Sequence, residues 1–152
     1  MTETAQRDAR VEANKLTLAR MLERISAGDP EAFVEMLTPG YVRHCQAMPP
    51  QLQEIRGPEA MLAWLRANQM TFPDYREELE YILGEGDFVA WRSRGTGTMA
   101  GPLGPFPATR KRMELTIIGM HRFEGGRIAE TWTSWDNVAA LRQLGLMPDA
   151  QP

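Results

Sequence analysis

Two histidines and one aspartate are the side chains of this sequence most suited to moving protons. His121 follows an apolar, β-branched run, His44 ends a short apolar segment beside a polar loop, and Asp136 directly follows Trp135. Imidazoles and carboxylates are common general acids and bases in enzymes, and histidine titrates closest to neutral pH. We therefore expect Asp136, His121 and His44 to have acid–base or orienting roles.

Each of these residues also has a structural explanation. Asp136 precedes apolar residues at helical spacing, so its carboxylate can cap a helix N-terminus, and this role is compatible with catalysis. His44 can form a hydrogen bond across a strand end, and His121 can be a core or surface histidine whose hydrogen bonds are satisfied. Without an ionisable side chain in the interior, the protein would only bind a ligand.

The hydrophobic pattern predicts the elements that position these residues. Three N-terminal helices are expected, the second and third with Pro at the first helical position, over residues 5–27, 30–37 and 58–71. The apolar period then changes to two, which predicts four long strands that begin near residues 75, 88, 113 and 128. A short strand is expected at 41–45, loops at 47–55 and 100–107, and a last helix after Asp136.

The order of these elements predicts the fold class. The long strands follow one another without intervening helices, which excludes a parallel, doubly wound sheet. We expect an α+β fold in which a curved antiparallel sheet is covered by the N-terminal helices around an apolar pocket. Gly95, Gly97 and Gly119 lie within strands and would allow the sheet to bend.

The alternation of apolar and polar residues along the strands predicts which side chains share a face of the sheet. Tyr75, Leu79, Tyr81 and Leu83 are expected on one apolar face, with Glu77 as an acidic exception. The outer face carries apolar residues that would bury against a second copy, which predicts a homodimer: Ile118, Met120, Ile128 and Trp132.

Flat and apolar side chains would line the pocket and contact a small polycyclic substrate. The expected substrate-binding residues come from the strands, the third helix and the segment that follows it: Tyr41, Arg43, Trp64, Phe72, Trp91, Ile117, Thr133 and Trp135.

The bulk properties exclude several classes of protein. The 152 residues predict a single domain, 1–152, with a core over about 16–146. A net charge of −3 gives no general attraction to nucleic acid or to an anionic membrane, and no apolar run is long enough to span a bilayer. A single cysteine fits a reducing, cytoplasmic compartment, and two His with one Cys cannot form a closed zinc site. The polar N-terminus does not resemble a signal peptide.

Several short motifs, in order, resemble those of the SnoaL-like polyketide cyclases, a branch of the nuclear-transport-factor-2-like superfamily. They are DPEAF at 29–33, YVRH at 41–44, GPEA at 57–60, FPD at 72–74, GDFVA at 86–90, GTGT at 95–98, RFEGGRIAETW at 122–132, Asp136, and RQLG at 142–145. The resemblance implies a cone-shaped α+β barrel with a deep apolar pocket. It also implies an activity like that of family members, which include aldol cyclases and hydroxylases of aromatic polyketides and need no metal, flavin or nicotinamide.

Two positions depart from the cyclase pattern. The acid–base aspartate that the resemblance implies for the last strand falls on Thr133, and the histidine of the preceding strand falls on Gly119. Threonine cannot ionise near neutral pH, so we expect a cofactor-independent enzyme of the hydroxylase-type branch. The alternatives are an intramolecular aldol cyclase and a non-catalytic protein that binds a small apolar ligand.

Overall fold

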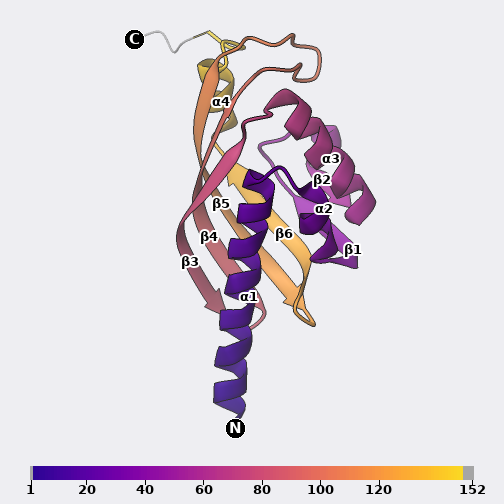
Figure 1. Cartoon of the computed structure of the whole chain (residues 1–152), viewed down its shortest axis with the longest axis vertical. Helices are drawn as coiled ribbons and strands as arrows, with labels where there is room; N and C mark the ends of the chain where they lie inside the picture. Colours follow the sequence, from indigo (N-terminus) through magenta and orange to yellow (C-terminus); the bar gives the residue numbers. More distant parts are fainter. Residues whose placement is uncertain (1, 149–152) are drawn as a thin grey trace.

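The computed structural model describes residues 2–148, which form one curved sheet with helices on its concave side (Figure 1). The strands are arranged in the order β2-β1-β6-β5-β4-β3. Every neighbouring pair is antiparallel except β1 and β6, which run parallel. The sheet is not closed, since β2 and β3 are its edges. This arrangement confirms the α+β prediction.

The elements have the following bounds. The helices are α1 (Glu3–Ser26), α2 (Pro30–Glu35), α3 (Pro58–Thr71) and α4 (Asn137–Gln143), with a short 3-10 turn at Pro50–Leu52. The strands are β1 (Leu37–His44), β2 (Glu54–Arg56), β3 (Arg76–Glu85), β4 (Phe88–Thr98), β5 (Arg112–Glu124) and β6 (Arg127–Trp135). The sequence pattern missed β2, whose three residues are too few to show a period, and it started β1 four residues late because Pro39 and Gly40 suggested a turn.

The helix starts follow the expected local chemistry. Asp29 accepts a hydrogen bond from the Ala32 N–H and Asp136 accepts one from the Ala139 N–H. These bonds satisfy N–H groups that have no partner within the helix. No helix within residues 2–148 is long and apolar enough to cross a membrane.

Two β-bulges correct the predicted faces. A shift of register between Leu79 and Tyr81 turns the second half of β3 over, so Tyr81 and Leu83 are 66% and 73% exposed instead of sharing the inner face with Leu79. In β6 the extra residue is Ala129, because Phe123 pairs with Ile128 whereas Arg122 pairs with Glu130. Ile128 is therefore fully buried and does not belong to the outer face.

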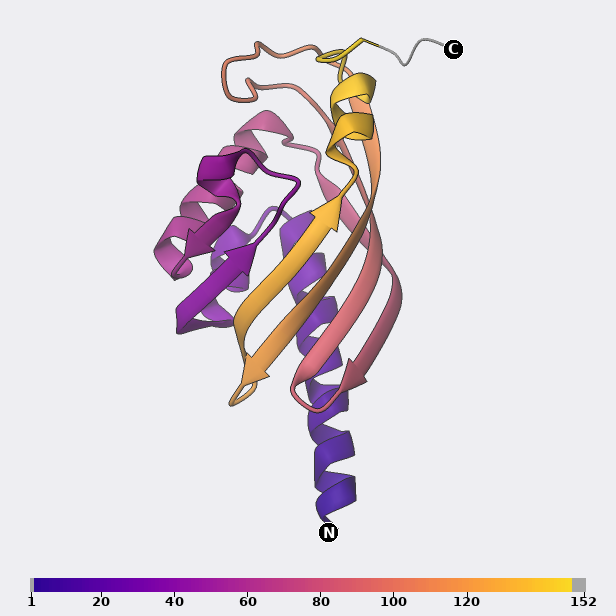
Figure 2. The same cartoon turned by 180° about the vertical axis from the view of Figure 1, so that it is seen from behind.

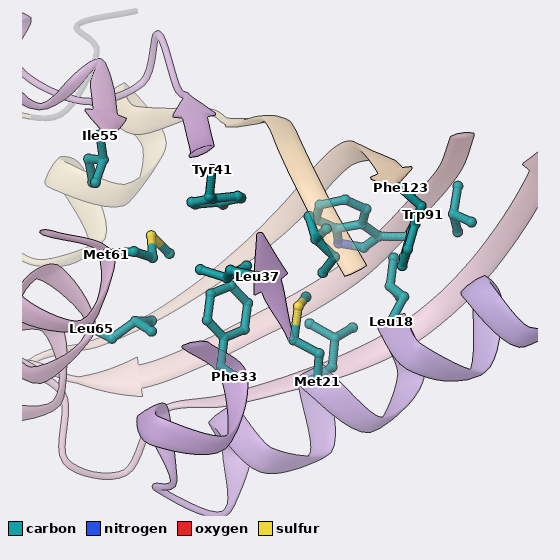
Figure 3. Close-up of a cluster of buried hydrophobic side chains, with 13 residues drawn as sticks. Leu18, Met21, Phe33, Leu37, Tyr41, Ile55, Met61, Leu65, Trp91 and Phe123 are labelled. Carbon is teal, nitrogen blue, oxygen red and sulfur yellow. The ribbon is translucent and has the colours of Figure 1, made fainter. Parts of the chain in front are cut away.

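The core lies between the concave face of the sheet and helices α1 to α3. Figure 3 shows its main cluster, in which Leu18 and Met21 of α1 and Phe33 of α2 face Trp91 and Phe123 of the sheet. A second cluster lies at the end of the sheet beside α4. It combines residues of β5 with α4, its C-cap and the residues that directly follow α3 and β4: Phe72, Met99, Met113, Leu115, Ile117, Ala140 and Leu144.

The loop between β4 and β5 extends beyond that end of the sheet (Figure 2). Its start is fixed to the last residue of α3, since the N–H groups of Ala100 and Gly101 both donate to the carbonyl of Thr71. The backbone thus holds the predicted 100–107 loop beside the second cluster.

Candidate functional site

An arginine lies inside the fold, and no carboxylate of residues 2–148 forms an ion pair with it. Arg43 alternates with His44 on β1, so its side chain enters the concave interior, where it is 3% exposed. Its guanidinium lies 4.4 Å from the centre of the Trp64 ring and 5.9 Å from that of Trp135. The Nη1 atom has no hydrogen-bond partner among residues 2–148. Aromatic faces stabilise the cation, but one of its donors remains free for another group.

A second interior group connects β1, β5 and β6. The Tyr41 hydroxyl donates to Thr131 Oγ1 at 2.9 Å, and Thr131 Oγ1 is 2.8 Å from His121 Nδ1. Because Tyr41 donates to Thr131, the threonine hydroxyl hydrogen is available to Nδ1, which favours the His121 tautomer protonated at Nε2. Burial lowers the pKa of His121 to about 3, so its ring is neutral near pH 7.

Burial also raises the pKa of Tyr41 to about 12. The phenol therefore keeps its proton and serves as a donor at neutral pH. His121 is stacked on Trp91 with 4.4 Å between the ring centres, and its Nε2 has no partner within the described part of the chain. This histidine is a buried neutral donor and not a cation.

A half-buried carboxylate lies at the edge of the same interior. Glu77 accepts hydrogen bonds from Ser93 Oγ at 2.5 Å and from the Tyr75 hydroxyl at 3.0 Å. Burial raises the pKa of Glu77, while the bonds from Ser93 and Tyr75, the nearby indole N–H of Trp91 and the positive charge of Arg43 act against this rise. The pKa of Tyr75 is raised as well, by burial and by the adjacent Glu77 charge.

Three buried nitrogen donors form no hydrogen bond of good geometry among residues 2–148: Arg43 Nη1, Trp91 Nε1 and His121 Nε2. Of these, the Trp91 N–H is close enough to the Glu77 carboxylate to lower its pKa. A buried donor without an acceptor costs about 1–3 kcal/mol. Donors of this kind can bind the oxygen acceptors of a ligand. Within the described residues, no three His, Cys, Asp or Glu side chains are grouped as metal ligands would be.

The structure separates the three residues expected to move protons. His121 is inside the fold, whereas His44 lies on the outer face, 2.8 Å from Glu130 and stacked on Trp132. Asp136 is exposed and caps α4. Of the residues expected to bind substrate, the interior contains Tyr41, Arg43, Trp64, Trp91 and Trp135, while Phe72 and Ile117 belong to the second cluster. Thr133 is half-buried and its hydroxyl donates to the carbonyl of Ile118.

Gly119 explains how the indole of Trp91 fits into this interior. The two residues are directly opposite each other on β5 and β4, and a Cβ added to Gly119 would lie 2.3 Å from the Trp91 ring. The indole therefore occupies the space of the missing side chain. A histidine at position 119 is incompatible with this placement of Trp91.

A hollow of about 110 Å³ opens beside this interior, between the end of α1, the start of α2 and the end of α3. Leu65, Phe72 and Tyr75 are among the residues that line it. Ligand sites for drug-sized molecules usually measure about 300 Å³ or more. A polycyclic ligand would require this hollow to widen toward the interior, past Tyr75.

Sequence reasoning placed Glu77 on the apolar face but not in the candidate site, and it missed Ser93 and Thr131 as interior polar residues. One signal could have identified Glu77, because its charge interrupts an otherwise apolar alternation. Ser93 and Thr131 carry no comparable signal, since threonine and serine are common on both faces of a strand.

A curved sheet with helices on its concave side and polar groups in its interior defines the class: this is the cone fold of the nuclear-transport-factor-2-like proteins. The sequence matches the family of SnoaL-like polyketide cyclases over residues 15–144. The chain belongs to this family. A comparison with functionally curated proteins found no match.

Solved structures agree with the family. IdmH from Streptomyces antibioticus, described as a candidate polyketide cyclase, is 33% identical; the alignment covers 87% of this chain and 98% of IdmH with a TM-score of 0.74. AclR from Streptomyces galilaeus, described as a candidate hydroxylase, is 23% identical over 93% of this chain and 90% of AclR, with a TM-score of 0.80, and shows the shared fold. TsrD from Streptomyces laurentii is 27% identical over 90% and 97% of the two chains, with a TM-score of 0.77.

Proposed function

We propose that this protein is a cofactor-independent tailoring enzyme that acts on an aromatic polyketide or a similar polycycle. The observation that carries the proposal is the group of three buried donors without a hydrogen bond among residues 2–148, next to the aromatic rings of Trp64, Trp91 and Trp135. Rings would stack on the tryptophans, and carbonyl or phenol oxygens would accept from the donors.

Within this class we propose the hydroxylase-type reaction. Thr133 cannot serve as the acid–base group expected of an aldol cyclase, and its hydroxyl is bonded to a backbone carbonyl. An electron-rich hydroquinone held in the interior would instead react with dioxygen, and the buried donors would stabilise the developing negative charge. The 33% identity with IdmH supports the aldol cyclase as the second candidate.

One experiment separates these reactions. The protein is mixed with chemically reduced 1,8-dihydroxyanthraquinone under ¹⁸O₂, and separately with an anthraquinone that bears a β-ketoester side chain. A hydroxylase adds one ¹⁸O atom to the first probe, whereas a cyclase converts the second by ring closure without ¹⁸O. If neither product exceeds the protein-free control but both probes quench tryptophan fluorescence, the protein only binds.

A matched pair of variants assigns the result to the interior. Arg43→Met removes the buried guanidinium, and Arg94→Met removes an exposed one that pairs with Glu78 on the outer face. We expect the first to weaken probe binding about tenfold or more and the second to leave it unchanged. Equal effects of the two would contradict an interior site.

We also propose that the enzyme is a cytoplasmic homodimer. Leu83, Ala90, Met120 and Trp132 are successive cross-strand neighbours and form an apolar row across the outer face. Arginines and glutamates that pair within the chain flank this row, so two copies related by a twofold axis would bury the apolar row and leave these pairs at its rim. Met120→Arg should then produce a monomer in sedimentation analysis, whereas a monomeric wild-type protein at high micromolar concentration would refute the dimer.

A further inference from the structure

Glu77 is a carboxylate on the inner face of an edge strand. It lies on β3, and the residue directly opposite on β4 is Gly95. A Cβ at Gly95 would lie 2.9 Å from the Tyr75 hydroxyl oxygen, so the glycine provides the space in which Tyr75 reaches Glu77. The carboxylate is held by two hydroxyl donors, and no Lys or Arg of residues 2–148 forms an ion pair with it.

The backbone around Glu77 is fixed from the helix side. The Ser26 hydroxyl accepts from the Glu77 N–H at 2.9 Å and is 3.3 Å from the Glu77 carbonyl oxygen. Ser26 is the last residue of α1, so the edge strand is attached to the long helix at this residue. The attachment fixes the direction in which the carboxylate enters the interior.

We propose that Glu77 is the proton acceptor of the interior site and that it works opposite Arg43; this inference rests on the proposed function. From β3, Glu77 supplies the ionisable group that Thr133 cannot provide on β6. A proton acceptor must be close to the reacting atoms yet poorly solvated, and hydroxyl donors hold its orientation.

The step is the same for both candidate reactions. Glu77 removes a proton from the carbon next to a substrate carbonyl, or from a phenol. The C–H or O–H bond breaks, a new O–H bond forms on the carboxylate, and the electron pair moves onto the substrate oxygen. Arg43 Nη1, Trp91 Nε1 and His121 Nε2 are the donors available to that oxygen. The net negative charge is transferred from Glu77 to the substrate, where the guanidinium stabilises it.

The hollow described above approaches this carboxylate through Tyr75. Tyr75 lines the hollow and donates to Glu77 Oε2, so one side chain separates the carboxylate from the opening. A substrate that entered past Tyr75 would come next to Glu77. Position and access therefore both favour Glu77 over the exposed Asp136.

The test uses 1-tetralone, a bicyclic aryl ketone whose C2 hydrogens exchange slowly in water. Exchange in D₂O is followed by NMR, and binding is followed by tryptophan fluorescence. We expect wild-type protein to accelerate exchange, and Glu77→Gln to lose about 100-fold or more of that acceleration while binding stays within about threefold. Glu77→Asp should retain part of the activity, and Glu78→Gln, which alters the adjacent outer-face carboxylate, should retain all of it.

The pH profile gives a second readout. Exchange by the wild type should rise with pH as Glu77 ionises, at a midpoint above that of an ordinary glutamate, whereas the Glu77→Gln profile should be flat. If wild-type protein binds 1-tetralone without exchange, or if Glu77→Gln exchanges as fast as wild type, Glu77 is not the base although the interior site remains. If wild-type protein does not bind the probe, the proposed function and this inference both fail.

Discussion

The two faces of the sheet differ in the partners of their charged side chains. On the outer face, glutamates and arginines of neighbouring strands pair across the ladder, as in Arg92–Glu80 and Arg94–Glu78. On the inner face, Arg43 rests on aromatic rings and Glu77 on hydroxyl groups. Exposed pairs form easily in water and contribute little, whereas a buried charge without an ion-pair partner is expensive. The inner charges are therefore the ones that suggest function.

The largest expected difference between the faces is in packing. Ile117 and Ile118 are adjacent on β5, but the first is 7% exposed and the second 60%. Ile117→Ala should lower the free energy of unfolding by about 2–4 kcal/mol, because it leaves a cavity between the sheet and α4. Ile118→Ala should change it by no more than about 0.5 kcal/mol. Urea unfolding of both variants at low protein concentration measures the difference, and equal losses would show that the faces are not distinct.

A smaller effect is expected in the pH dependence of the free energy of unfolding, and its cause is the buried His121. Burial lowers its pKa to about 3, so the unfolded chain binds a proton below about pH 6.5 and the folded chain does not. His121 therefore leaves the free energy of unfolding unchanged above pH 6.5 and lowers it progressively as the pH falls toward 3. The loss between pH 8 and pH 5 should be about 2 kcal/mol.

His121→Gln should remove this part of the pH dependence. Its unfolding free energy, measured at intervals from pH 8 to pH 5, should decline less steeply than that of the wild type. His44→Gln is the matched variant on the outer face and should keep the wild-type contribution of His121. Parallel curves for wild type and His121→Gln would mean that the buried ring is protonated in the folded protein.

The smallest effect is expected for the outer ion pairs. Arg94→Ala removes the partner of Glu78, and both side chains are well exposed. The thermal midpoint should stay within measurement error of the wild type, at low salt and at 1 M NaCl alike. A clear loss of stability that salt abolishes would show that the outer ladder acts as a network and would weaken the contrast between the faces.

Sequence patterns predicted the fold well because its signals are local. Proline after a capping residue marked the starts of α2 and α3, and the change of apolar period after Phe72 marked the start of the long strands. The bulges in β3 and β6 were not predicted, since an extra residue in a strand leaves no mark on composition. They moved Tyr81, Leu83 and Ile128 to the opposite face from the one expected.

The site was harder to predict because it depends on which strands are neighbours. The pairing of β1 with β6 brings Tyr41 to Thr131, 90 positions away along the chain. Arg43 and His121 were singled out for their chemical type, and the structure places both in the interior. His44 and Asp136 were chosen on the same grounds, yet alternation along β1 and the start of α4 place them elsewhere. Nothing in the sequence paired Glu77 with Ser93.

The bulge in β3 separates two stretches of one strand that have opposite orientation. Before it, Glu77 and Leu79 share the inner side; after it, Ile82 takes that side while Leu83 is in water. In a homologue that lacked this extra residue, every later position of the strand would exchange solvent for core. The number of residues between position 77 and the β3–β4 hairpin, more than their identity, would then determine which relatives place the same positions of this strand in the core.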